Sequence, residues 1–330
     1  SAKAFLPPSS TPSSGLILIQ TIAIPNVDGR IDHMAIDIRG QRLFVAELGN
    51  NSLDVIDLKA AKRIYSISNN ERLLNEPQSV VFIPELNRIF VSNGQDGTVD
   101  VFDAKSFRFI KKIKLPSDDA DNMRYDPNSK LVYVGYGEGS LGIINTTNYN
   151  IIGDIMLSGH PESFQIEQEK GGVSGQNQRI FINVPQSNSV EVIDSQKQTI
   201  SKTWRIINAQ NNFPMALDET NHRLFVSTRD PSKLIVFDTD SGKVISVLDI
   251  GKDSDDIFYD AIKKRIYVSC GQGTVNIFQQ QDANHYHAIG NFGTAPGART
   301  SLFVPELHLF YVAVPHIGNQ ESKMLVYQVG

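Results

Sequence analysis

Histidines with acids close by are the residues of this sequence best suited to chemistry. His33 directly follows Asp32, and His160 lies two positions before Glu162. Carboxylate oxygens favour Ca²⁺, Mg²⁺ or Mn²⁺, and imidazole nitrogens shift the preference towards Zn²⁺, Mn²⁺ or Fe²⁺. The sequence therefore predicts a divalent metal site, with Ca²⁺, Zn²⁺ or Mn²⁺ as the ion. The candidate ligands are Asp32, His33, Asp121, Asn122, Glu162, Asp255 and Asp256.

The two histidines are also the candidate catalytic residues. His33 or His160, if it is not a ligand, could act as the general base that takes a proton from water. A structural role remains the alternative for the acids, which could instead accept hydrogen bonds from backbone N–H groups and from trapped water.

Other polar residues are candidates for substrate binding. An arginine fork binds a carboxylate or phosphate in bidentate fashion, which is one role for Arg30 and Arg299. Both could equally pair with Asp32 or Asp255 and only balance charge. The full set of candidates is Arg30, Arg299, Tyr136, His316 and Asn212.

These residues are far apart in the sequence, so a repeat must bring them together. The phrase Arg-Leu-Phe-Val at 42–45 returns six times in variant form, and its aromatic column recurs every 42 to 48 residues. A repeat of this length in a strand-rich chain predicts propeller blades of about four strands. The aromatic column is Phe44, Phe90, Tyr133, Phe181, Phe225, Tyr267 and Tyr311.

The expected fold is therefore all-β: one seven-bladed β-propeller of four-stranded antiparallel blades over residues 15–330. Blade 2 reads most clearly, with strands at 79–83, 88–92, 98–102 and 109–113. The last blade supplies only three strands, so the segment 16–24 is expected to pair with it and close the ring, which removes exposed edges. In each blade the first strand lines the axis. The candidate residues then gather at the axial mouth, where those strands begin.

Composition narrows the function classes. A net charge of −5 and the lack of any Lys/Arg-rich run argue against nucleic-acid binding. No apolar stretch reaches the roughly 18 residues that cross a bilayer. Residues 1–14 are rich in Ser and Pro and are expected to form a flexible tether of a secreted or surface-tethered, extracytoplasmic protein, although a trimmed expression sequence looks the same.

The repeat also resembles a known family. The Phe-Val and Tyr-Val phrases, followed after a hairpin by sequences such as Val-Glu-Val-Ile-Asp at 190–194, resemble the YVTN-type β-propellers. That resemblance covers nearly the whole chain and implies a seven-bladed ring, often exported, related to lactonase-type propellers. The segments before the first strands depart from the family's Gly-x-Pro phrase and are acidic instead. The well-known calcium-dependent lactonases have six blades, another departure.

Two functions from different classes follow. The first is a metal-dependent hydrolase of small lactones or esters, with a small-molecule ligand in the axial mouth. In that reaction Arg30, Arg299 or Tyr136 would hold the developing oxyanion. The alternative is a non-catalytic, exported or surface-tethered module that binds a metal, a carbohydrate or a protein partner.

Overall fold

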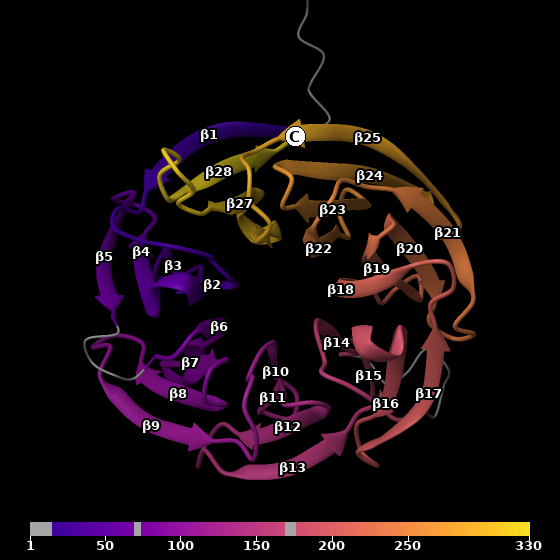
Figure 1. The fold of residues 1–330 in the computed structure, drawn as a ribbon, viewed down its shortest axis with the longest axis horizontal. Coiled ribbons are helices and arrows are strands. Elements are labelled where there is room, and N and C mark those ends of the chain that lie inside the picture. The colour runs from indigo at the N-terminus through magenta and orange to yellow at the C-terminus, as the bar shows by residue number, and fades with distance from the viewer. Residues whose placement is uncertain (1–14, 69–73, 169–175) are drawn as a thin grey trace, which may run out of the picture.

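The computed structural model describes residues 15–68, 74–168 and 176–330. Seven four-stranded antiparallel sheets stand around a central axis as the blades of a closed ring (Figure 1). Among the described residues the only helical elements are short 3₁₀ turns. The predicted seven-bladed β-propeller is confirmed, and the predicted tether at 1–14 lies outside the described residues.

Blade 2 shows how each blade is built. From the axis outward it contains β6 (Pro77–Ile83), β7 (Arg88–Asn93), β8 (Thr98–Asp103) and β9 (Phe109–Lys114), within two residues of the predicted bounds. Asn87 turns the chain between the first two strands with a left-handed φ of 52°, which asparagine tolerates. The Asp103 carboxylate then accepts hydrogen bonds from the backbone N–H groups two and three residues further on, at 2.9 and 2.8 Å. These bonds fix the turn before β9.

The other complete blades repeat this order. Blade 1 consists of β2 (Met34–Asp37), β3 (Arg42–Glu47), β4 (Ser52–Asp57) and β5 (Lys62–Ile67). Blade 3 consists of β10 (Met123–Asp126), β11 (Leu131–Tyr136), β12 (Ser140–Asn145) and β13 (Ile151–Met156). Blade 4 consists of β14 (Phe164–Ile166), β15 (Arg179–Val184), β16 (Ser189–Asp194) and β17 (Thr199–Arg205). Blade 5 consists of β18 (Gln210–Asp218), β19 (Arg223–Asp230), β20 (Ser232–Asp238) and β21 (Val244–Asp249). Blade 6 consists of β22 (Ser254–Asp260), β23 (Arg265–Cys270), β24 (Thr274–Asp282) and β25 (His285–Gly293).

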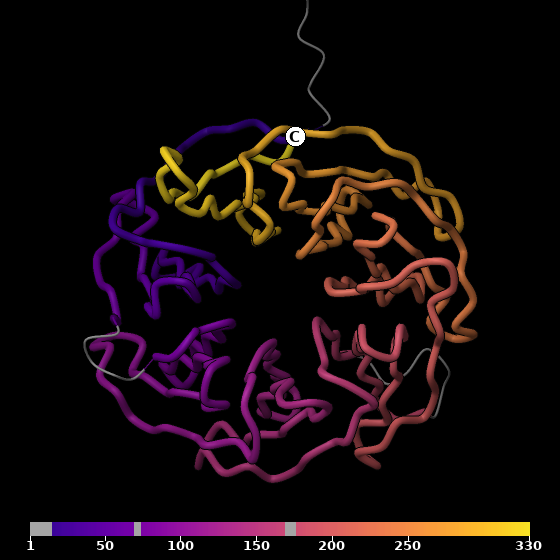
Figure 2. Tube along the Cα trace, viewed as in Figure 1, coloured from indigo at the N-terminus to yellow at the C-terminus, as the bar shows by residue number. Residues whose placement is uncertain are grey.

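Blade 7 joins the two ends of the chain. Its sheet runs β26 (Ser301–Val304), β27 (Leu309–Val314), β28 (Lys323–Val329) and then β1 (Leu16–Ala23), which pairs antiparallel with β28. Figure 2 shows the indigo start of the chain running beside its yellow end. The predicted closure by the N-terminal strand is therefore confirmed.

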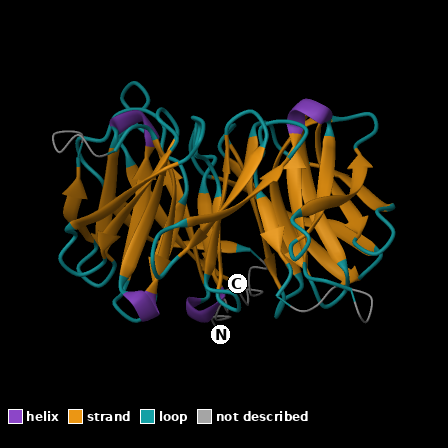
Figure 3. Cartoon of the chain, turned by 90° about the horizontal axis from the view of Figure 1, so that it is seen from below, coloured by secondary structure: helices purple, strands orange, loops and turns teal. Residues whose placement is uncertain are grey.

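The aromatic column builds the core between neighbouring blades. Phe44 of blade 1 is buried together with Val80 and Phe102 of blade 2. In the same way Tyr133 of blade 3 is buried against Phe164 of blade 4. Because each sheet buries both faces against its neighbours, the loops are left to form the two faces of the ring, as the side view in Figure 3 shows.

Within residues 15–68, 74–168 and 176–330, no helix has the length and apolar character needed to cross a membrane.

Two acids are buried side by side near the end of one hairpin. Glu47 at the end of β3 and Asp54 in β4 are fully buried, and Asp54 also pairs with Arg63 at 3.1 Å. Burial and the neighbouring Asp54 raise the pKa of Glu47 well above its ordinary value. No described group donates a hydrogen bond to either Glu47 oxygen, and Asp54 is already paired with Arg63, so Glu47 is the carboxyl of the two that holds a proton.

Glu47→Gln should therefore stabilise the protein at alkaline pH. The folded wild type keeps the Glu47 proton while the unfolded chain releases it above a pKa of about 4.3, so wild-type stability falls as pH rises past that value. The stability of the variant does not fall for this reason, because glutamine does not titrate. Its amide N–H can also donate a hydrogen bond to Asp54. Urea unfolding should show it more stable than wild type at pH 8 by on the order of 1 kcal/mol, with the difference closing towards pH 4. Glu306→Gln on an exposed turn is the control, and parallel pH profiles for wild type and Glu47→Gln would contradict the prediction.

Candidate functional site

The backbone holds the candidate residues at the mouth by one repeated bond. The N–H groups of Asp32, Asp121 and Glu162 donate to carbonyls of the second strands of their own blades, at 2.8, 2.8 and 2.9 Å. Further bonds run sideways, such as that from the His33 N–H to the Gln78 carbonyl of the next blade at 3.2 Å. The segments before the inner strands are thus fixed by the ring itself.

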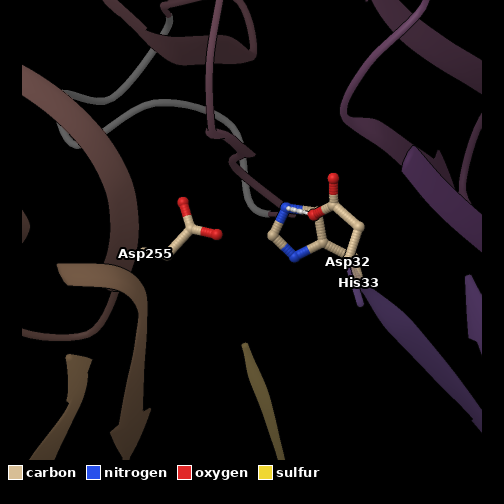
Figure 4. A group of neighbouring side chains, drawn as sticks. All are labelled: Asp32, His33 and Asp255. Carbon is tan, nitrogen blue, oxygen red and sulfur yellow. Dashed lines mark ion pairs between the residues drawn. The ribbon is translucent and has the colours of Figure 1, made fainter. Parts of the chain in front are cut away.

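One cluster joins blades 1 and 6. Ligand atoms of Asp32, His33 and Asp255 all lie within 4.8 Å of one another. His33 Nε2 is 3.3 Å from Asp32 Oδ1, and its Nδ1 is 3.5 Å from Oδ1 of Asp256. Figure 4 shows Asp255 apart from the adjacent pair Asp32 and His33, because it comes from blade 6, which is separated from blade 1 by blade 7.

A second cluster joins blades 3 and 4. Ligand atoms of Asp119, Asp121 and His160 also lie within 4.8 Å of one another. His160 Nδ1 lies 2.6 Å from the Gly137 carbonyl, which can only accept, so this nitrogen carries a proton. The other nitrogen, Nε2, faces Asp121 Oδ2 at 3.2 Å and Glu162 Oε1 at 3.9 Å. In the neutral ring, Nε2 is therefore the free ligand atom.

The acids outweigh burial in setting the charge of both histidines. Burial lowers the pKa of His33, but Asp32 and Asp256 raise it to about 10. Burial likewise lowers the pKa of His160, and Asp121 and Asp119 raise it to about 9. Without a bound cation both rings are positively charged at neutral pH and cannot accept a proton. A general-base role for either histidine would therefore require a nearby bound cation, held by other ligands, to lower the pKa of that ring.

The acids themselves hold protons more tightly than usual. Burial raises the pKa of Asp32 to about 7, against the opposing effects of His33 and Arg30. Burial, together with Asp121 and Asp255, raises the pKa of Glu162 well above its ordinary value. Negative charge is thus crowded at the mouth, and a cation would relieve the repulsion.

Two buried oxygens at the mouth accept no hydrogen bond within the described part of the chain. They are Asp32 Oδ1, which has only the His33 ring beside it, and Asn122 Oδ1. The other end of the Asn122 amide donates to Asp121 at 3.3 Å. A buried acceptor left without a donor costs about 1–3 kcal/mol, and a metal ion is one partner that would satisfy it. The mixed oxygen and imidazole donor set thus fits a divalent ion.

The arginines at the mouth pair with acids. Arg30 lies 3.3 Å from Asp255, and Arg299 lies 2.7 Å from Asp253. Arg229, from the hairpin of blade 5, also reaches Asp255 at 3.1 Å and stacks over the Phe213 ring at 3.9 Å. Arg30 thus has one of the two charge-balancing partners expected from the sequence, whereas Arg299 pairs with Asp253 instead of Asp32 or Asp255.

Three predicted substrate-binding residues lie apart from the clusters. Tyr136 is buried between blades 2 and 3, where its hydroxyl donates to Asp154 at 3.0 Å. Asn212 is buried and donates to Asn183 Oδ1 at 2.8 Å and to the Ser189 carbonyl at 2.9 Å. His316 is exposed beside a separate hollow formed with residues 25–28.

Four residues of the site were not among the predicted site residues: Asp119, Asp253, Arg229 and Arg124. Asp119 and Asp253 lie two residues before Asp121 and Asp255, an equivalence that the aligned repeats show. In the structure both have left-handed φ values, 53° and 61°. Arg124, in β10, lines a cavity that His33 and Asp256 also line.

Comparison with known proteins supports the fold alone. No protein-family model matches the chain, and no curated protein matches its sequence. Among solved structures, a chain of Kuenenia stuttgartiensis hydrazine synthase is similar with a TM-score of 0.76 and 17% identity, covering 92% of this chain and 98% of that one. The WD40 repeats of RRP9 are similar with a TM-score of 0.78 and 7% identity, covering 96% and 98%.

Proposed function

We propose that the axial mouth binds a divalent metal ion and hydrolyses a small lactone or ester there. The observation that carries the proposal is the cluster of Asp32, His33 and Asp255, whose ligand atoms lie within 4.8 Å of one another. Beside it, the buried Asp32 and Asn122 oxygens lack hydrogen-bond donors among the described residues. Oxygen and imidazole ligands together favour Zn²⁺ or Mn²⁺ over Ca²⁺.

The bound ion would polarise the substrate carbonyl and acidify water. Glu162 faces the mouth, and no group in the described ranges donates a hydrogen bond to its side chain. Once a bound cation had lowered its raised pKa, the Glu162 carboxylate would be placed to take a proton from the attacking water. The water oxygen bonds to the carbonyl carbon and the ester C–O bond breaks. The leaving oxygen keeps the electron pair and receives a proton from an imidazolium such as His160, which gives an acid and an alcohol.

The arginine pairs favour a second candidate. Because Arg30, Arg229 and Arg299 already contact acids, fewer groups are left to hold a developing oxyanion. The mouth would then serve a non-catalytic module, exported or surface-tethered, that retains a metal and binds a carbohydrate or protein partner.

Metal analysis followed by an activity panel tests the proposal. The protein purified without added metal should retain about one equivalent of a divalent ion, and it should hydrolyse at least one of a set of γ- and δ-lactones and aryl esters. Chelation should lower that rate at least about 10-fold, with recovery when the ion is restored. Absence of both a retained metal and chelator-sensitive hydrolysis would overturn the proposal. Tight metal retention with no hydrolysis would instead establish the second candidate.

A further inference from the structure

A cavity of about 430 Å³ lies along the inner strands below the mouth. This volume is within the range of about 300–1,000 Å³ typical of small-molecule pockets. His33 and Asp256 line the cavity where it meets the mouth, and apolar side chains such as Met215, Phe258 and Leu302 line it further along. Among its described lining residues the only arginine or lysine is Arg124, from β10.

Arg124 differs from the arginines of the mouth in having no acid partner. Arg30, Arg229 and Arg299 each reach a carboxylate at 2.7 to 3.3 Å. Across the described ranges, no carboxylate lies within 4.0 Å of Arg124. Its Nη1 donates to the Met123 carbonyl at 2.8 Å and its Nη2 to Ser163 Oγ at 3.2 Å. Only two of the five N–H groups of the guanidinium are thus used.

The surroundings hold this guanidinium in place. It lies 5.4 Å from the centre of the Phe164 ring, and Ser163 anchors it from the next blade. Burial lowers the pKa of Arg124, against the opposing charges of Asp256 and Asp121, so the cation is poorly solvated. A positioned arginine with unused N–H groups binds a planar carboxylate through two parallel hydrogen bonds.

We infer that Arg124 binds the carboxylate of a small organic acid whose apolar part fills the cavity below the mouth. A monoanion fits better than a phosphate dianion, because Asp256 and Asp121 lie close enough to repel the second charge. If the proposed hydrolase function holds, the substrate is a lactone or ester that also carries a carboxylate. Anion binding itself does not depend on the metal.

Calorimetry on the metal-free protein tests this with phenylacetate and its neutral isostere phenylacetamide. Wild type should bind phenylacetate at least about 10-fold more tightly than the amide, as expected for a charge-assisted pair. Arg124→Gln should abolish that preference and Arg124→Lys should keep part of it, since lysine retains the charge but not the fork. Arg108→Gln on an exposed turn removes the same charge elsewhere and should leave the preference unchanged.

The wild-type comparison stands even if Arg124→Gln fails to fold, because equal or tighter binding of the amide by wild type would overturn the inference. An unchanged preference in folded Arg124→Gln would overturn it as well. Carboxylate binding without metal-dependent hydrolysis would contradict the proposed hydrolase function and still support the anion site. Chelator-sensitive hydrolysis with no preference for the carboxylate would contradict the anion site alone.

Discussion

His33→Ala and Asp255→Asn should each lower metal retention and chelator-sensitive hydrolysis by roughly 100-fold. Removing a group that supports a metal ligand already costs about 10- to 100-fold, so loss of a ligand should cost at least the upper end of that range. The double variant should be little worse than either single one, because residues that hold one ion act as a unit. Metal analysis and initial rates measure both effects.

The chain offers a matched control for this pair. His285, at the start of the outer strand of blade 6, is exposed and remote from the mouth. Its Nδ1 lies 2.8 Å from Oδ1 of Asp282, which is exposed as well. His285→Ala and Asp282→Asn make the same chemical changes and should leave metal retention and rate unaltered. Full metal occupancy in the mouth variants, or equal losses in both pairs, would remove these residues from the site.

Deletion of residues 1–24 should unfold the ring or drive it to aggregate, whereas deletion of 1–14 should change stability by less than about 1 kcal/mol. The longer deletion removes β1 and the buried side chains of Leu16, Ile22 and Ile24. Burial of three such side chains contributes roughly 5–9 kcal/mol, comparable with the total stability of about 5–15 kcal/mol typical of a domain. It also leaves β28 as an open edge.

Thermal unfolding and size-exclusion chromatography distinguish the two deletions. Addition of a peptide covering residues 15–24 should restore the monomer of the longer deletion, because its seven residues paired to β28 supply the missing strand. A monomeric product of the 1–24 deletion with an unchanged Tm would show that closure by β1 contributes little.

The ring could be predicted because its signals are local, and its closure could be predicted because the last blade lacks one strand. Alternating polarity, turn residues and the repeated phrase fix each blade, and the incomplete last blade leaves one place for the segment that became β1. The convergence at the mouth followed from aligning the blades. The alignment alone therefore placed four acids at the mouth, without any information on side-chain packing: Asp32, Asp121, Glu162 and Asp255.

Side-chain direction at single positions was less predictable. Asn212 was expected to bind substrate, but a register shift in β18 between Asn212 and Met215 accompanies its placement in a buried amide network. Tyr136 ends its strand at the mouth side, yet its side chain is buried between blades 2 and 3, with its hydroxyl bonded to Asp154. Arg124 was missed because only the positions before the inner strands were compared, whereas Arg124 lies inside β10.

The pairing of Leu16 with Val329 has a consequence for biosynthesis. The first strand of the ring must wait for its partner until nearly the whole domain has been translated, which takes about 15 to 60 s at 5–20 residues per second. During that interval its apolar Ile17, Leu18 and Ile19 have no sheet to join, and they stay largely exposed even in the finished fold. Nascent chains of this protein should therefore depend on chaperones that shield this segment until the final blade emerges.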